Sequence, residues 1–127
     1  MSALLLDTHA WAWSLNGSDR LSGPALAAMT RTATILVSPV SFFEIAQKVR
    51  LGKWPAMAPH VGDLPALLER QGARPAPLGP EICTRAGMMA WEHRDPFDRL
   101  IAATAILLGI PLVSADPVFD GIAPRLW

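Results

Sequence analysis

The sequence has few of the features that mark an extracellular or membrane protein. Its 127 residues include one cysteine, Cys83, which cannot form an internal disulfide. The longest apolar stretch, residues 101–110, is far shorter than the ~20 residues needed to cross a bilayer. No secretory signal is recognisable. We therefore expect a cytoplasmic protein in a reducing compartment, with Cys83 packed as a small core side chain.

The sequence also has no net charge, and its His and Cys residues lack the spacing of a zinc site. Eleven acidic and eleven basic residues give a formal charge of zero. This balance neither indicates nor excludes a nucleic-acid binder, because a local basic patch can bind nucleic acid even where the total charge is zero. His and Cys residues do not show the spacing of a zinc site. Repeats, linkers and low-complexity segments are absent, so we expect one soluble domain that spans residues 1–127.

What the sequence does contain is an alternation of short apolar runs with helical segments bounded by Gly, Pro and capping residues. Strands are predicted at residues 3–6, 34–37, 74–78 and 112–114. Helices are predicted at residues 8–15, 25–31, 39–51, 64–71, 80–93 and 96–108. This alternation predicts an α/β fold with three α/β/α layers and a central parallel sheet of four to five strands.

Four acidic residues are predicted to meet at one edge of this sheet. Asp7 directly follows the first strand, and Asp116 comes two residues after the fourth. Glu44 lies early in the helix after the second strand, and Asp98 lies in the first turn of the helix before the fourth. Catalytic groups collect outside the carboxyl ends of parallel strands. The four carboxylates converge there if the start of the 96–108 helix leans over that edge.

Two of these acids have structural interpretations that the residues alone leave open. Asp7 can cap the helix that begins after it. Glu44 can complete a capping box with Ser41 or pair with Lys48 one turn later. Apolar residues surround Glu44, however, which favours a buried position near the sheet edge.

Three further acids have local structural interpretations at helix starts and turns. Asp95, followed by Pro96, is typical of a helix N-cap, and we expect that role for it. Asp98 at the third helical position benefits from the helix dipole. Asp116 before Pro117 is an ordinary turn starter. No single acid therefore establishes a site.

Four segments in order give a stronger signal together: LLLDTHA at 4–10, SFFEIAQK at 41–48, HRDPFDRLIA at 93–102 and PLVSAD at 111–116. In combination they closely resemble the PIN-domain family, in its VapC-like toxin branch, and so imply a PIN-like fold. The resemblance implies that Asp7, Glu44, Asp98 and Asp116 form an acidic site. The family often has Trp before the Glu and Thr before the final Ala-Asp. Phe43 keeps the bulk and Ser114 keeps the hydroxyl at those positions.

The resemblance implies an endoribonuclease, the toxin of a type II toxin–antitoxin pair, that leaves a 5′-phosphate and a 3′-hydroxyl. Clustered carboxylates suit a hard divalent cation, Mg²⁺ or Mn²⁺, which can activate water for phosphodiester hydrolysis. Asp7, Asp98 and Asp116 are expected to be metal ligands. Glu44 is expected to be a ligand or a base that orients water.

The expected partners are RNA, an antitoxin and a second copy of the chain. The family's antitoxin lays a helix in an apolar groove, which residues 10–15 and 42–49 are expected to line. Lys48, Arg94 and Arg99 are candidate phosphate contacts, although solvated surface charges are equally consistent. The hydroxyls of Thr8 and Ser114 can orient carboxylates or cap elements.

Aromatic and histidine side chains have structural interpretations at this stage. Trp11 and Trp13 are expected in the core or an interface rather than as stacking platforms, and His9 and His93 in structural roles. Two other functions stay open. A phosphatase with an aspartyl nucleophile would need a second Asp where His9 stands. A catalytically inactive PIN-fold binding domain would not need all four acids.

Overall fold

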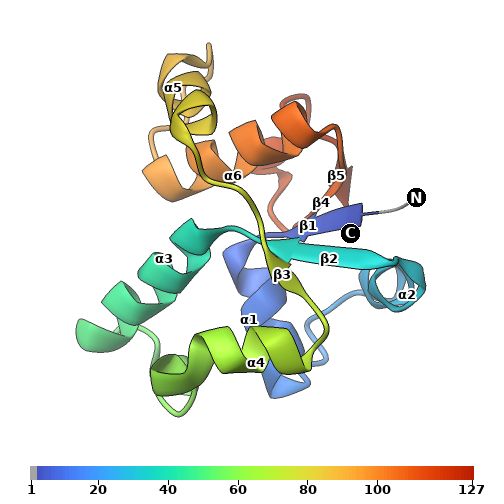
Figure 1. Ribbon diagram of the computed structural model, residues 1–127, viewed down its shortest axis with the longest axis vertical. Coiled ribbons are helices and arrows are strands. Elements are labelled where there is room, and N and C mark those ends of the chain that lie inside the picture. Colours follow the sequence, from blue (N-terminus) through green and yellow to red (C-terminus); the bar gives the residue numbers. More distant parts are fainter. Residues whose placement is uncertain (1–2) are drawn as a thin grey trace.

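A parallel sheet of five strands forms the centre of the computed structural model, which describes residues 3–127 (Figure 1). The strand order is β3-β2-β1-β4-β5, and every pairing is parallel. The strands are β1 (Ala3–Leu6), β2 (Thr34–Val37), β3 (Arg74–Pro75), β4 (Leu112–Val113) and β5 (Arg125–Leu126). All carboxyl ends therefore lie at the same edge.

Six α-helices surround the sheet in the described part of the chain. They are α1 (Thr8–Asn16), α2 (Gly23–Arg31), α3 (Pro39–Arg50), α4 (Leu64–Arg70), α5 (Pro80–Met88) and α6 (Pro96–Leu108), with short 3-10 turns at Pro55–Met57, Val61–Asp63 and Pro117–Phe119. The predicted α/β class and the order of elements are confirmed. None of the helices in residues 3–127 is long and apolar enough to span a membrane.

The side chains of β1 point alternately to the two faces of the sheet, and each face packs against its own layer of helices. Leu4 and Leu6 pack in one core with residues of α1, α2, α3 and α4, whereas Leu5 packs in a second core with residues of α6. All three leucines are almost fully buried. Burying each contributes roughly 1.5–3 kcal/mol. A strand buried on both faces is what the unbroken apolar run before Asp7 predicts.

Three expectations from the sequence need correction. The helix predicted at 80–93 ends at Met88, because the carbonyls that follow turn toward the Arg99 guanidinium. The strand predicted at 74–78 is only two residues long, and β5 adds a strand near the C-terminal end. Cys83 is exposed rather than in the core, because α5 buries its other face through Ile82 and Ala86.

Helix starts bring polar side chains to the carboxyl edge of the sheet. Asp7 caps α1, Ser38 caps α3 and Asp95 caps α6, each accepting a hydrogen bond from a backbone N–H of the first turn. Asp116 caps the 3-10 turn after β4 in the same way. The capping interpretations are thus correct, but they do not exclude a site, because a cap uses one carboxylate oxygen and leaves the other.

Candidate active site

A cleft of about 390 Å³ lies at the carboxyl edge of the sheet. It is lined by residues of α1, α3, the start of α6 and the segment after β4. These are Asp7, Thr8, His9, Trp13, Glu44, Lys48, Asp95, Asp98, Ala115, Asp116, Pro117 and Phe119. All four predicted site acids therefore reach one cleft, and the start of α6 does lean over this edge.

The buried polar residues of the cleft are Asp7, Thr8 and Glu44, and we call them the inner wall. Asp7 is only 8% exposed, and its Oδ1 accepts a hydrogen bond from the Ala10 N–H at 2.8 Å. Burial raises the pKa of Asp7 from 3.8 to about 6. The Ser114 hydroxyl and the Ala10 amide oppose this rise in pKa, whereas the charges of Asp98 and Glu44 add to it. An ionised Asp7 is thus costly in the metal-free protein.

Glu44 and Lys48 form an ion pair on the same wall. Their Oε2 and Nζ atoms are 2.6 Å apart, and the carboxylate is far more buried than the ammonium. The Lys48 ammonium also lies over the Trp54 ring, 5.5 Å from its centroid. Thr8 Oγ1 and Ser41 Oγ share a buried hydrogen bond of 2.8 Å that joins α1 to α3. Both interpretations of Glu44 therefore hold together: it pairs with Lys48 and lines the cleft.

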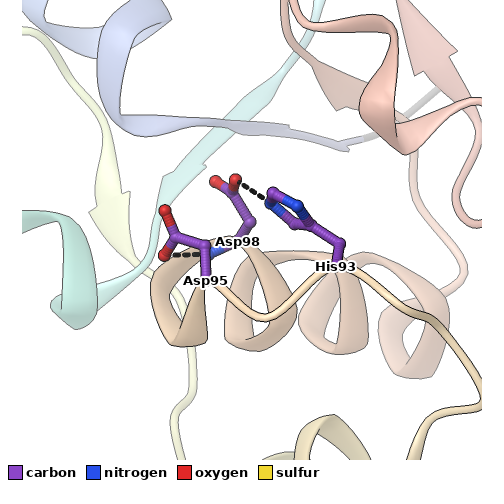
Figure 2. A group of neighbouring side chains, drawn as sticks. All are labelled: His93, Asp95 and Asp98. Carbon is purple, nitrogen blue, oxygen red and sulfur yellow. Dashed lines mark hydrogen bonds and ion pairs between the residues drawn. The ribbon is translucent and has the colours of Figure 1, made fainter.

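The less buried acids of the cleft are Asp95, Asp98 and Asp116, and we call them the outer wall. Figure 2 shows Asp98 pointing toward His93, whose Nε2 lies 2.7 Å from Asp98 Oδ2. Asp95 Oδ1 accepts hydrogen bonds from the Phe97 and Asp98 amides at 2.9 and 3.4 Å. Burial raises the pKa of Asp98, and the hydrogen bond from His93 opposes that rise. Asp95 Oδ1 thus caps α6, as predicted.

Asp116 is the exposed member of the four acids. Its Oδ1 accepts a hydrogen bond from the Val118 amide at 2.9 Å, and its own amide donates to Ser114 Oγ at 3.0 Å. Ser114 is fully buried, so its hydroxyl ties the exposed turn to the end of β4. Asp116 is held by its turn rather than by the core.

The four acids do not form one tight group of potential ligand atoms in the described residues. In residues 3–127, the group whose potential ligand atoms lie within 4.8 Å of one another is His93, Asp95 and Asp98 (Figure 2). Asp7, Glu44 and Asp116 stand further apart from this group. The sequence pointed to the acids but gave His93 a structural role. Its position five residues before Asp98, at the end of a loop, was the signal that it could reach that carboxylate.

Arg99 is not a phosphate contact, which corrects one of the alternatives drawn from the sequence. Its five N–H donors point at backbone carbonyls: Nε at Ala86, Nη1 at Trp91 and His93, and Nη2 at Gly87 and Met89, with distances between 2.6 and 3.4 Å. This matches the whole donor capacity of a guanidinium. Arg99 therefore holds the segment that carries His93. Arg94, the neighbouring candidate, is exposed and does not line the cleft.

Two aromatic predictions had different outcomes. Trp11 is fully buried in the core, as expected. Trp13, two residues further along α1, is only partly buried and lines the cleft together with His9.

The three apolar residues from Ala10 to Ala12 are all fully buried. Of the residues 10–15 expected to line a groove, only Trp13, Ser14 and Leu15 therefore keep exposed surface.

The fold and the acidic cleft define a class of protein. Comparison with known proteins identifies the family. The model of the PIN domain matches residues 4–123, and this chain belongs to the PIN-domain family. Ribonuclease VapC22 of Mycobacterium tuberculosis (strain ATCC 25618 / H37Rv) is 32% identical over 117 residues, which cover 91% of this chain and 88% of that protein.

Solved structures of similar proteins share the fold at low identity. The VapBC2 structure from Rickettsia felis, bound to a DNA fragment from its promoter, matches with a TM-score of 0.65 and 17% identity, covering 97% of this chain and 96% of that one. A toxin–antitoxin complex from Klebsiella pneumoniae gives 0.67 and 17%, covering 96% and 94%. Mycobacterium tuberculosis VapC20, described as a Sarcin-Ricin loop cleaving toxin, gives 0.59 and 18%, covering 94% and 96%.

Proposed function

We propose that this chain, a single PIN domain, is a metal-dependent endoribonuclease that acts as the toxin of a toxin–antitoxin pair. The observation that carries the proposal is the convergence of Asp7, Glu44, Asp98 and Asp116 on one cleft. They come from the end of β1, from α3, from α6 and from the turn after β4. The relative named Ribonuclease VapC22 supports the reaction class.

The donor set of the cleft fits a hard divalent cation. Its carboxylates supply oxygen ligands, which Mg²⁺ and Mn²⁺ prefer. Asp7 is buried and its pKa is raised to about 6, so a cation beside it would offset the cost of its charge. Asp7, Asp98 and Asp116 would hold the ion. When bound, the ion supplies a water of lowered pKa and stabilises charge on the leaving oxygen.

The chain's own residues orient these groups. The Ala10 N–H fixes Oδ1 of Asp7, and His93 fixes Oδ2 of Asp98, so one oxygen of each carboxylate is left for the cleft. Glu44 holds the ion or takes a proton from the attacking water. Lys48 holds Oε2 of Glu44 through their ion pair and offers the cleft a positive charge beside the substrate phosphate. The resemblance to the family favours products with a 5′-phosphate and a 3′-hydroxyl.

The toxin role implies an antitoxin partner, a second copy of the chain and a cytoplasmic site of action. The structural neighbours from Rickettsia felis and Klebsiella pneumoniae are toxin–antitoxin assemblies, which supports an antitoxin here. Of the helices predicted to line its groove, α3 offers the more accessible surface, because Phe43 is 60% exposed. The groove is thus proposed along α3 rather than along Ala10 to Ala12.

One assay separates this function from its alternatives. Purified protein is incubated with structured RNA, with EDTA, Mg²⁺ or Mn²⁺, and with a phosphomonoester in parallel. We expect RNA cleavage with either metal, none with EDTA, and no release of phosphate from the monoester. Tight RNA binding without cleavage under any metal would identify an inactive binding domain and overturn the proposal. Monoester hydrolysis would favour the aspartyl-nucleophile phosphatase.

A further inference from the structure

An aromatic row borders the acidic cleft and is not used by the proposed metal chemistry. The His9 ring lies 4.7 Å from the Trp54 ring and 5.7 Å from the Trp13 ring, measured between centroids. Trp13 in turn lies 5.7 Å from Trp127. We define the aromatic row as His9, Trp13, Trp54 and Trp127. It combines one face of α1, the loop after α3 and the residue after β5.

The row is continuous with the site and open to it. His9 and Trp13 are four residues apart on α1, which places them on the same helix face. Both line the cleft that contains Asp7 and Glu44. His9 is exposed and the other three rings are partly buried, so none is a core side chain like Trp11. Rings in this position offer π-surface within reach of a substrate whose phosphate lies among the acids.

Charge in the cleft makes such a neutral contact important. The lining includes five carboxylates, whereas Lys48 is the only Lys or Arg among the lining residues of the described chain. That ammonium is already paired with Glu44. The sequence as a whole is neutral. Affinity for nucleic acid that rests on many phosphate contacts needs many basic residues, and this cleft does not supply them. Stacking of bases on aromatic rings is the other common source of affinity.

We propose that the aromatic row holds an unpaired nucleobase of the RNA next to the cleaved bond, with Trp13 and His9 as the contacting residues. This inference rests on the proposed nuclease function and adds to it the residues that contact the base beside the cleaved bond. Only an unstacked base has a free face for the row, so a base inside a duplex is excluded. The aromatic row is thus a specificity-determining element, not part of the hydrolytic step.

The test removes the base and the ring separately and together. A series of short single-stranded RNAs, each lacking one nucleobase, is cleaved by wild type, Trp13→Ala, Trp13→Phe and His9→Ala. For one position of the missing base, wild type should lose about tenfold in kcat/KM, within the range of base stacking on an aromatic ring. Trp13→Ala should lose about as much on intact RNA, mainly through KM, and should cleave both RNAs equally. Trp13→Phe should stay near wild type.

Leu26→Ala is the control for the loss of an exposed apolar side chain, because Leu26 of α2 is 54% exposed and does not line the cleft. It should behave as wild type on every RNA. If Trp13→Ala does not fold, the His9→Ala comparison decides. An equal penalty for the missing base in wild type and in the row variants would overturn the stacking and leave the row to a protein partner.

A second readout separates failure of this inference from failure of the nuclease function. Fluorescence anisotropy of the same labelled RNAs with EDTA measures binding without cleavage. If binding depends on both the base and Trp13 but the protein never cleaves RNA, base stacking by the aromatic row is supported and the nuclease function is overturned. If the protein cleaves RNA without this dependence, the nuclease function is supported and base stacking is overturned. A protein that neither binds nor cleaves these RNAs would overturn both.

Discussion

The two walls of the cleft carry the same chemical groups but hold them in different ways. On the inner wall, Asp7 and Glu44 are 8% and 6% exposed and lie against the apolar core. On the outer wall, Asp98 is partly exposed and Asp116 is exposed. Hydrogen bonds from turns, from His93 and through Arg99 position that wall. Burial thus fixes the inner wall and raises the pKa of Asp7 to about 6, whereas the outer wall is held by polar contacts, one of which opposes the burial-driven rise in the pKa of Asp98.

The largest expected effect is a loss of kcat, and we expect it for acids of both walls. Asp7→Asn and Asp98→Asn should each lower kcat by at least about 100-fold, more than the 10–100-fold loss usual when the partner of a metal ligand is removed. Asp95→Asn is the matched control on the outer wall, because Asn keeps the N-cap of α6. Cleavage rates with Mn²⁺ measure all three. Equal losses in Asp95→Asn and Asp98→Asn, with folding intact, would place Asp95 in the site.

The next effect is specific to the outer wall. Arg99→Lys cannot satisfy the five carbonyls that the guanidinium contacts, and we expect a loss of about 3 kcal/mol in unfolding free energy. Hydrogen exchange should rise in residues 86–93 while β1 stays protected. Urea unfolding and exchange measurements test this, with the exposed Arg94→Lys as control. If exchange rises equally in β1, the two walls are not held independently.

A stability effect of similar size belongs to the inner wall and depends on pH. Because burial raises the folded pKa of Asp7 from 3.8 to about 6, the native state binds this proton more tightly than the unfolded chain. The associated stability is complete below pH 3.8 and is lost as pH rises through about 6. Without metal at pH 7, Asp7→Asn should therefore exceed wild type by up to about 3 kcal/mol.

Asp116→Asn is the contrast on the outer wall. Its side chain is exposed and Asn can keep the cap, so its unfolding free energy should stay within about 0.5 kcal/mol of wild type. Urea titrations between pH 4 and 8 in EDTA measure both variants. A stability gain in Asp116→Asn as large as that in Asp7→Asn would mean that burial does not distinguish the walls.

The smallest effect comes from metal. Mn²⁺ at about ten to a hundred times its dissociation constant should stabilise wild type by about 1–3 kcal/mol, and EDTA should reverse the gain. The gain should shrink in variants of either wall, because both supply ligands. Thermal melts with Mn²⁺ and with EDTA measure it. An undiminished gain in Asp116→Asn would remove Asp116 from the ligand set.

The sequence was most informative where a local pattern and a tertiary role coincide. The apolar run before Asp7 and the capping signals of the helix predicted at 39–51 gave their elements to within about a residue, because burial and capping are local signals. The end of α5 was not predictable, since it depends on Arg99, which reaches back along the chain to the residues after Ala86. The exposure of Trp13 also depends on how α1 is placed against its neighbours.

The edges of the sheet have a consequence for self-association. Both edge strands, β3 and β5, are only two residues long, and Pro75 of β3 has no N–H to donate. Short edges interrupted by proline are poor templates for an incoming strand. A second copy of this chain, or an unfolded one during synthesis, therefore gains little by extending the sheet. We therefore expect the proposed homodimer to use surfaces other than the sheet edges, and the short edges protect the sheet against strand-by-strand aggregation.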